Sequence, residues 1–461
     1  MEKNNIPEII DNLIIIPDTN ILLYLYKCSF NSSQNIVELL NKVKDMVVVP
    51  SRVYKEYMAH KDEEQAKIDR KYDNFTKDLK KQISELKGKI CGSISESRKY
   101  DFPNCDELET GINTFLDRAV QAITTYEGSL SSEKQNKTVQ ITSVEQLIQY
   151  WDSQGRVLPE PSIVKIMEYV KEGEFRFKYK MPPGYMDEAE KDSEVKKDSK
   201  KDNFEGRIRK YADLFVWKEL ISIGKREQGN KYILFLTNDV KEDWWVLKGE
   251  QNSKEAVRMR DELLREYSSE TGNVKIEFLT LSKFYELFSD YYKICDIKTS
   301  LELDVDSYIK GYIIPKYQEE INQYMEEQLV RIDLEDLNPE YYDALKPFFE
   351  VYDIEVTEIG LHYDDEGETA IYEIVLEGET NTEQILRIED EGTSWIADME
   401  LQITVFAEIQ RDLRNLDEDG IKFESSHIEV VSDREAWEVY LDMESMAKAD
   451  RDDTLEDYYN H

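Results

Sequence analysis

The chain has 461 residues, of which 40% are hydrophobic and 11% aromatic, so it is long enough for about two to four domains and too apolar for wholesale disorder. Its formal net charge of -39 is unevenly placed: residues 301–461 hold 46 acidic and 11 basic side chains, whereas residues 1–300 hold 52 and 48. The acidic average therefore does not exclude a nucleic-acid partner for the nearly neutral first part.

The cysteines and histidines argue against a zinc site. The chain has four of each, scattered without a CxxC pair or a regular spacing. The first residues lack the apolar core of a signal peptide, and no stretch approaches 18 apolar residues. We expect a cytoplasmic protein with reduced thiols, neither secreted nor embedded in a membrane.

The first elements read as strand, acidic turn and helix. Residues 13–16 form a continuous apolar run that ends at Pro17, the pattern of a strand buried on both faces. Asp18, Thr19 and Asn20 follow as helix-capping residues. Residues 46–49 repeat the strand pattern, and the helix expected after them carries Glu56.

Residues 61–205 look like a helical insertion, because they are mostly charged and have helical character. Breaks are expected near 91–93 and 159–161. Within the insertion, a Pro-Pro-Gly-Tyr-Met-Asp segment at 182–187 precedes a stretch of lysines and acids at 188–203, which we expect to be mobile.

A helix resumes near residue 208, and Asp213 lies on its otherwise apolar stripe. Residues 232–236 form a third buried-strand run that ends in Thr-Asn-Asp, and residues 274–279 give a fourth. Strands that alternate with helices predict an α/β fold with a mainly parallel sheet.

Four carboxylates are candidates for one site. Asp18 and Asp239 directly follow strands, and ligands bind beyond the carboxyl ends of strands in open parallel sheets. If Glu56 and Asp213 join them, the like charges repel unless a cation neutralises them. Mg2+ or Mn2+ suits such an oxygen cluster and supports attack of water on a phosphodiester.

Each acid also has a plainer reading. Asp18 and Asp239 serve equally well as helix caps, and Glu56 as a solvated helix residue. Asp213 could instead form a structural salt bridge with Arg209 or Arg260.

Several short motifs, in this order along the chain, resemble the PIN-like domain of the subgroup with a long helical insertion. The matching pieces are Asp18-Thr19-Asn20, Val49-Pro50-Ser51 with Glu56, the Pro-Pro-Gly-Tyr segment to Asp187, Tyr211-Ala212-Asp213-Leu214 with Trp217, Thr237-Asn238-Asp239 with Lys241, Asp243 and Trp244, and Arg260, Glu262, Leu263 and Glu266. The resemblance implies a three-layer PIN-like sandwich over residues 1–300 and metal-dependent nuclease activity, more often on RNA than on DNA. It further implies a toxin or phage-defence role.

By the same resemblance, Asp18, Glu56, Asp213 and Asp239 would be the catalytic, metal-binding acids. Asp187, Thr237 and Asp243 are additional candidates. The candidate phosphate-binding residues Lys191, Lys201, Arg209 and Lys210 come from the charged stretch instead, where interspersed acids favour a solvated loop.

The acidic part reads as a linker at 301–311 and a smaller α+β domain at 312–461. Apolar and polar residues alternate along 399–409, the period of a sheet covered on one face, and 354–363 with 371–376 suggests a hairpin. Its acidic surface serves solubility, or it binds a basic protein partner or restrains the nuclease.

The sequence thus predicts a Mg2+- or Mn2+-dependent endonuclease with an appended regulatory or assembly domain. A homo-oligomer is a further expectation. The competing class is a non-catalytic PIN-like scaffold that acts through its acidic domain, for which clustered carboxylates would be unnecessary.

Overall fold

The computed structural model describes residues 6–100, 102–197, 202–227, 231–248, 255–272, 274–331, 343–344, 350–388, 393–416 and 419–433. The chain divides into two compact units, the first reaching Leu303 and the second beginning at Asp304. In these ranges, no helix combines the length and the apolar character needed to cross a membrane.

A three-stranded parallel sheet forms the centre of the first unit. Its strands are β1 (Leu13–Pro17), β2 (Tyr232–Leu236) and β5 (Lys275–Leu279), in the order β1-β2-β5. The apolar runs of β1 and β2 are almost entirely buried, as two-sided coverage requires, whereas Lys275 of β5 is exposed. The predicted α/β class with a parallel sheet is confirmed.

The prediction of a continuous strand at residues 46–49 is wrong. Val47 forms an isolated bridge to Ile15, but Val49 bridges to Val157 instead. The backbone amide of Val48 still donates to the carbonyl of Ile15. The amide of Val49 then donates to the carbonyl of Arg156, and its carbonyl accepts from the amide of Leu158, both in a segment much later in the chain. The chain therefore leaves the edge of β1 after one residue.

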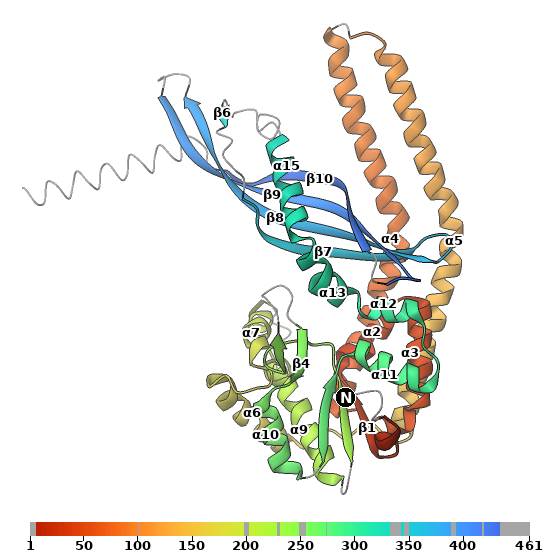
Figure 1. Ribbon diagram of the computed structural model, residues 1–461, viewed down its shortest axis with the longest axis vertical. Helices are drawn as coiled ribbons and strands as arrows, with labels where there is room; N and C mark the ends of the chain where they lie inside the picture. Colours follow the sequence, from red (N-terminus) through yellow and green to blue (C-terminus); the bar gives the residue numbers. More distant parts are fainter. Residues whose placement is uncertain are drawn as a thin grey trace, which may run out of the picture. The chain divides into compact units, whose positions relative to one another are not determined.

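Helices cover both faces of the sheet, which gives three layers (Figure 1). On one side lie α2 (Thr19–Lys27), α3 (Phe30–Lys42) and α11 (Leu281–Tyr292), and on the other α9 (Ala212–Arg226) and α10 (Asp261–Thr271). Their apolar faces and the strands form one hydrophobic core. A short antiparallel hairpin of β3 (Trp245–Lys248) and β4 (Glu255–Met259), which the sequence did not predict, precedes α10.

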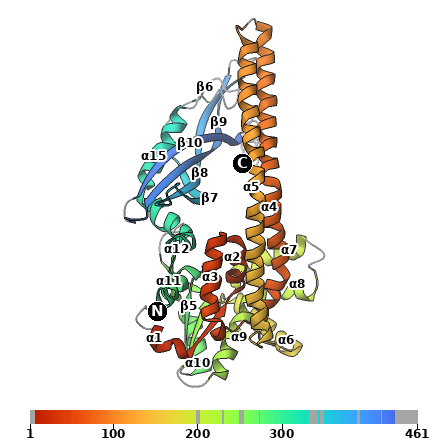
Figure 2. The ribbon, with the colours of Figure 1, turned by 90° about the vertical axis from the view of Figure 1, so that its right-hand side faces the viewer.

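Two long helices form an antiparallel hairpin, the arm, within the predicted insertion. They are α4 (Ser51–Ser97) and α5 (Cys105–Ser153), which run side by side in Figures 1 and 2. The break expected at 91–93 is wrong: Gly88 and Gly92 lie inside α4, and packing against α5 offsets their low helix propensity. The turn comes later, near Asn104, which has a left-handed φ of 60°.

Shorter helices complete the first unit: α1 (Ile6–Ile9), η2 (Ile10–Asn12), η3 (Lys44–Met46), η4 (Arg98–Tyr100), α6 (Ile163–Lys178), η5 (Tyr185–Asp187), α7 (Glu188–Lys197), α8 (Phe204–Ile208), η7 (Arg209–Tyr211) and α12 (Ile297–Leu303). The stretch expected to be mobile is helical as far as Lys197, where α7 ends.

The second unit is an antiparallel sheet with helices before it. Its strands are β6 (Asp343–Ala344), β7 (Tyr352–Tyr363), β8 (Thr369–Ile388), β9 (Thr393–Asp412) and β10 (Asp419–Asp433), ordered β10-β9-β8 with β7 and β6 both on β8. Leu401, Ile403 and Val405 of β9 are buried whereas Phe406 is exposed, so the predicted one-sided sheet is confirmed.

The segment read as a linker is helical. It forms α13 (Val305–Tyr308), a π-helical turn η8 (Ile309–Ile313) and α14 (Ile314–Lys316) before α15 (Gln318–Arg331). Ile309 and Ile313 are fully buried, and this apolar burial, which the local polarity of the segment obscures in the sequence, orders the backbone.

Candidate active site

Asp18 lies where β1 passes into α2. Its backbone amide donates to the carbonyl of Leu236 at 2.8 Å, which extends the pairing of β1 with β2 by one step. Its Oδ1 accepts from the amide of Thr19 at 2.7 Å, so Asp18 does cap α2. Its Oδ2 accepts from the side chains of Asn20 at 2.7 Å and Thr237 at 2.8 Å.

Burial raises the pKa of Asp18 to about 6. The hydrogen bonds from Thr237 and Thr19 favour the ionised form and oppose this rise, while the charges of Glu56 and Asp239 add to it. Three of the four predicted acids, Asp18, Glu56 and Asp239, are therefore close enough for their charges to affect one another.

Asn20 joins the ends of β1 and β2, a role that the sequence did not reveal. Besides Asp18, its amide group donates to the Thr237 hydroxyl at 3.0 Å, and its carbonyl accepts from the amide of Asn238 at 3.0 Å. The amide of Asp239 donates to the same hydroxyl at 3.1 Å. Thr237, an additional candidate for the site, is therefore a buried link between Asp18 and Asp239.

Glu56 faces this strand edge from α4. Its Oε2 accepts from the hydroxyl of Thr19 at 3.1 Å, and its Oε1 pairs with the Nε of Arg52 at 2.9 Å, one helical turn earlier. The plain reading of Glu56 as a solvated helix residue is therefore incomplete, because the side chain is fixed from two sides. The i,i+4 spacing of Arg52 and Glu56 is visible in the sequence.

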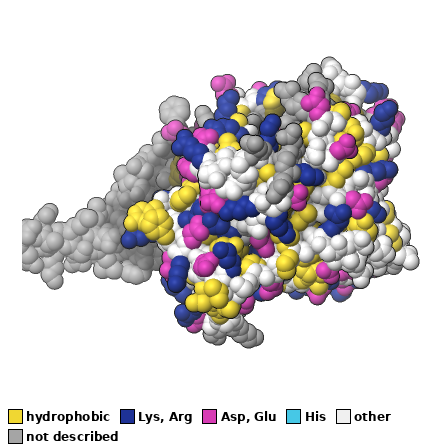
Figure 3. All heavy atoms as spheres, turned by 90° about the horizontal axis from the view of Figure 1, so that it is seen from below, with side chains coloured by type: hydrophobic (Ala, Val, Ile, Leu, Met, Phe, Trp, Pro, Cys, Tyr) yellow, Lys and Arg dark blue, Asp and Glu magenta, His cyan; other side chains and the backbone are white. Residues whose placement is uncertain are grey.

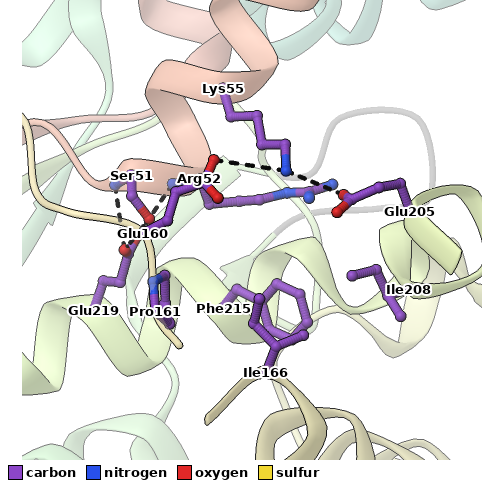
Figure 4. A pocket seen from close by; sticks show the side chains of 10 residues that line it. All are labelled: Ser51, Arg52, Lys55, Glu160, Pro161, Ile166, Glu205, Ile208, Phe215 and Glu219. Carbon is purple, nitrogen blue, oxygen red and sulfur yellow. Dashed lines mark hydrogen bonds and ion pairs between the residues drawn. The ribbon is translucent and has the colours of Figure 1, made fainter. Parts of the chain in front are cut away.

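A buried glutamate holds the start of α4 and thereby positions Glu56. Glu219 of α9 accepts from the amides of Ser51 at 3.2 Å and Arg52 at 3.3 Å, and from the Ser51 hydroxyl. Figure 4 shows these bonds beside a small pocket whose apolar side includes Phe215. Burial raises the pKa of Glu219, although the two amides and the hydroxyl oppose this rise.

Asp213 stands at the start of α9, in contact with the glycine of the Pro-Pro-Gly segment. A Cβ added to Gly184 would lie 3.0 Å from the Cβ of Asp213, and Gly184 has a φ of 92°. The indole Nε1 of Trp244 donates to Oδ2 of Asp213 at 3.4 Å. Burial raises the pKa of Asp213 to about 7; the charge of Lys191 opposes this, and those of Asp187, Asp18 and Asp239 add to it.

The structural salt bridge considered for Asp213 is not formed with Arg260, which pairs with Glu262 and donates to the carbonyl of Glu242. Arg209 lies beside the ring of His60, 3.5 Å from its Nε2. Among the described residues, Asp18 and Asp213 form no direct ion pair; desolvation raises the pKa of both, and the charge of Lys191 opposes this rise at Asp213.

Two lysines lie among the acids. Lys241 contacts Asp187 at 2.6 Å and Asp239 at 3.1 Å, and Lys191 contacts the other oxygen of Asp187 at 2.9 Å. Burial alone would raise the pKa of Asp187, but the lysines outweigh it and lower that pKa. Asp187 is thus an ion-paired neighbour of the site, and no helix begins at Asp239, so its reading as a helix cap is wrong.

Asp243 fixes the Pro-Pro-Gly segment. It is fully buried, and its Oδ2 accepts from the amides of Gly184 at 2.8 Å and Met186 at 3.2 Å. Its Oδ1 has no hydrogen-bond partner in the described part of the chain, and burial raises its pKa. Asp243 therefore positions the backbone that packs against Asp213.

The remaining basic candidates are less concentrated than the acids. Lys210 pairs with Glu188 at 3.3 Å and with Asp192 at 3.1 Å, and Lys201 lies outside the described residues. On the face shown in Figure 3, lysines and arginines lie interspersed with acids. Lys191 pairs with Asp187, next to the four acids.

The donor chemistry of the site suits a hard divalent cation. All four predicted acids supply carboxylate oxygens, and two of them, Asp18 and Asp213, are partly buried with raised pKa values. As the side chains stand, no three His, Cys, Asp or Glu groups within the described ranges are arranged to hold a metal ion. Lys191 and Lys241 supply the nearby positive charge in this arrangement.

A parallel sheet between helices, with carboxylates at the carboxyl ends of two adjacent strands, defines an α/β domain whose candidate site lies at the ends of those strands. The family model described as PIN-like domain matches residues 14–263. The chain belongs to the PIN-like domain family, and the matched region includes every residue predicted for the site. Comparison with curated proteins and with solved structures gave no match.

Proposed function

We propose that this protein is a metal-dependent endonuclease that hydrolyses phosphodiester bonds. The observation that carries the proposal is the pair Asp18 and Asp213, two partly buried carboxyls from separate elements of a PIN-like domain, whose pKa values are raised to about 6 and about 7. Desolvation and the mutual repulsion of these like charges destabilise a fold, and the charge of Lys191 only partly offsets this at Asp213, which favours a functional role.

In this proposal Asp18, Glu56, Asp213 and Asp239 hold Mg2+ or Mn2+. The bound ion would supply Lewis-acid stabilisation and an activated water for attack on the phosphodiester. Thr237 and Asn20 hold Asp18 at the strand edge, and Arg52 and Thr19 hold Glu56. Lys191 and Lys241 are placed to balance the negative charge of the acids and of an incoming phosphate.

The narrower parts of the proposal are an RNA substrate in preference to DNA, a cytoplasmic location, and a role as a toxin or phage-defence effector. They rest on the family resemblance. The acidic second unit is proposed to regulate the nuclease or to bind a basic partner, on the strength of its 46 acidic and 11 basic residues from position 301 onward.

A cleavage assay tests the proposal. The wild-type chain is incubated with single-stranded RNA, single-stranded DNA and plasmid, with Mn2+ or with EDTA, beside an Asp18→Asn, Asp213→Asn double variant. An Asp62→Asn variant is the matched control, because Asp62 lies on α4 beyond Glu56 and its side chain is 81% exposed. We expect Mn2+-dependent cleavage by the wild type and the control, and loss of at least about 1,000-fold in the double variant.

One specific observation favours the competing class, a non-catalytic scaffold. Glu56 and Asp239 each have a basic partner, and no described cluster is ready to hold a metal. A scaffold would bind nucleic acid or protein equally well with Asp18 and Asp213 replaced. Absence of cleavage by the wild type under every metal condition, with unchanged binding by the double variant, would support the scaffold.

A further inference from the structure

Arg176 of α6 is a buried cation that the proposed chemistry does not use. Its side chain is 3% exposed, and its guanidinium makes three contacts. Nε donates to Oε1 of Glu172 at 2.7 Å, one helical turn earlier, and Nη2 pairs with Glu266 of α10. Nη1 donates to the backbone carbonyl of Pro182 at 2.6 Å. Because a guanidinium is planar and its N–H groups point in set directions, it holds these three acceptors in a fixed relation to one another.

Arg176 belongs to a charge-balanced cluster of two cations and two carboxylates. Lys218 of α9 pairs with Glu172 at 2.6 Å and with Glu266 at 2.9 Å. The second oxygen of Glu266 accepts from the indole Nε1 of Trp217 at 3.0 Å. Burial would raise the pKa of Glu266, but Arg176 and Lys218 outweigh burial and lower that pKa, which keeps the carboxylate charged. The cluster therefore joins α6, α9 and α10 and needs no further ion to balance it.

Stability alone is a poor reason to bury this cluster. Removal of charged groups from water costs free energy, and well-packed apolar side chains of similar volume often give equal or greater stability. The acceptors of Arg176 suggest another reason, since two of them lie on helices and the third, the carbonyl of Pro182, does not. Pro182 begins the Pro-Pro-Gly segment, defined here as residues 182–187.

The Pro-Pro-Gly segment is fastened at two places. Arg176 holds the carbonyl of Pro182, and Asp243 accepts from the amide of Gly184 at 2.8 Å. Pro183 lies between these two contacts, and its ring fixes the backbone dihedral φ. A displacement at the Pro182 carbonyl is therefore passed on to Gly184.

The fastened segment packs against the acids of the site. A Cβ added to Gly184 would lie 3.0 Å from the Cβ of Asp213, so the backbone there is in close contact with that side chain. Asp187, at the other end of the segment, pairs with the two lysines that lie among the acids. Release of the segment at Pro182 would therefore loosen the contact with Asp213 and shift the charges nearest the site.

We propose that Arg176 is a positioning residue of the candidate site: by holding the carbonyl of Pro182, it keeps the Pro-Pro-Gly segment packed against Asp213. Glu172 and Glu266 orient the guanidinium and balance its charge. The consequence for metal binding rests on the proposed function, whereas the fastening of the segment does not, and each has its own measurement.

Hydrogen exchange of the full-length protein tests the fastening without metal or substrate. Arg176→Met removes the guanidinium and keeps an unbranched side chain. Lys218→Met is the matched control, because it takes a cation from the same two carboxylates, and no hydrogen bond from Lys218 to residues 182–187 is found in the described part of the chain. Exchange is followed by mass spectrometry in EDTA. We expect the amides of Gly184 and Met186 to exchange at least about ten-fold faster in Arg176→Met, because a hydrogen bond from a charged group is lost, and to stay within about two-fold of the wild type in the control.

A second variant keeps the test decisive if Arg176→Met does not fold. Arg176→Lys retains a cation for both carboxylates but replaces the planar guanidinium with a single ammonium group, so it should fold and still release the segment. Circular dichroism and exchange of the amides of β2 check folding. Unchanged exchange of the segment in the folded Arg176 variants, or equally fast exchange in Lys218→Met, would overturn the proposal.

Mn2+ affinity tests the link between the segment and the site. Binding to the full-length protein is measured from the loss of the electron paramagnetic resonance signal of free Mn2+, in the absence of nucleic acid. We expect Arg176→Met to weaken binding by at least about ten-fold and Lys218→Met by less than about two-fold. Equal affinity of Arg176→Met and the wild type would overturn the positioning role. A wild type that binds no Mn2+ would refute the proposed function instead, and the exchange result alone would then decide whether Arg176 holds the segment.

Discussion

The hydroxyl of Thr237 donates to Oδ2 of Asp18 across 2.8 Å, although the two residues are 219 positions apart in the chain. The bond links the ends of two adjacent parallel strands and is the strongest influence opposing the raised pKa of Asp18. Because it favours the ionised carboxylate, it keeps Asp18 closer to the charged form that the proposed cation site requires.

Replacing Thr237 with valine should therefore raise the pKa of Asp18 further. Loss of one hydrogen bond of about 1 kcal/mol corresponds to roughly 0.7 pKa unit. We expect the midpoint of the pH–cleavage curve to move upward by about 0.5 to 1 unit at low metal concentration. Thr299→Val is the control, since Thr299 is also buried but bonds to Asn35 and Asp296; a shift of equal size there would contradict the assignment.

The pH dependence of the wild type follows from the same carboxyls. If cleavage needs Asp18 and Asp213 ionised, activity should rise through the pKa values of about 6 and about 7 and level off above them. A metal ion competes with protons for these oxygens, so higher Mg2+ should move the midpoint to lower pH. Initial rates measured from pH 5 to 9 at two metal concentrations check this. A midpoint that stays the same at both metal concentrations would contradict this prediction.

The contribution of Asp213 to the free energy of unfolding should fall as the pH rises, whereas cleavage activity should increase. A carboxyl whose pKa is raised on folding binds its proton more tightly in the native state, so it lowers stability as pH rises from its unfolded value of 3.8 toward about 7. Asp213→Asn should therefore increase the free energy of unfolding at pH 8 in EDTA by about 1 to 3 kcal/mol. This gain should shrink as the pH falls toward 4, and urea unfolding at several pH values measures it. Destabilisation at pH 8 would argue that Asp213 is held by a counter-charge.

Gly184 is expected to be a sensitive position for activity. It combines a φ of 92° with close contact to Asp213, so Gly184→Ala should both strain the backbone and push that carboxylate aside. Gly155→Ala is a matched control, with a φ of 65° but no atom within 4 Å of the added Cβ. Both should lose about 1 kcal/mol of stability, and only Gly184→Ala should lose cleavage activity. Equal activity of the two variants would show that Asp213 tolerates displacement.

Local patterns in the sequence predict the central fold well. Continuous apolar runs predict β1 and β2, and the alternation along β9 predicts a one-sided sheet, because a strand covered on both faces is apolar throughout whereas a strand covered on one face alternates. The segment at 46–49 has the same composition as a strand, yet its pairing is divided between β1 and the chain after α5. Such a division depends on distant partners, so composition cannot reveal it.

The acids of the site were predictable as a set, but their partners were less so. Asp18 and Asp239 follow strands, which local pattern identifies, and Arg52 lies one turn before Glu56. The contact of Lys241 with Asp187 spans 54 positions and depends on where η5 meets the loop after β2. Asn20 could be read from the sequence as a cap residue, but its bonds to Thr237 and Asn238 require the parallel pairing of two strands.

The central claim is that Asp18 and Asp213, with Glu56 and Asp239, bind one or more divalent cations. Crystals of the full-length protein soaked in Mn2+ at pH 8 test it most directly by anomalous scattering. We expect a Mn2+ peak about 2.0 to 2.4 Å from carboxylate oxygens of Asp18 and Asp213, and its loss in the Asp18→Asn, Asp213→Asn variant. A peak confined to other carboxylates, or none at all in the wild type, would contradict the account.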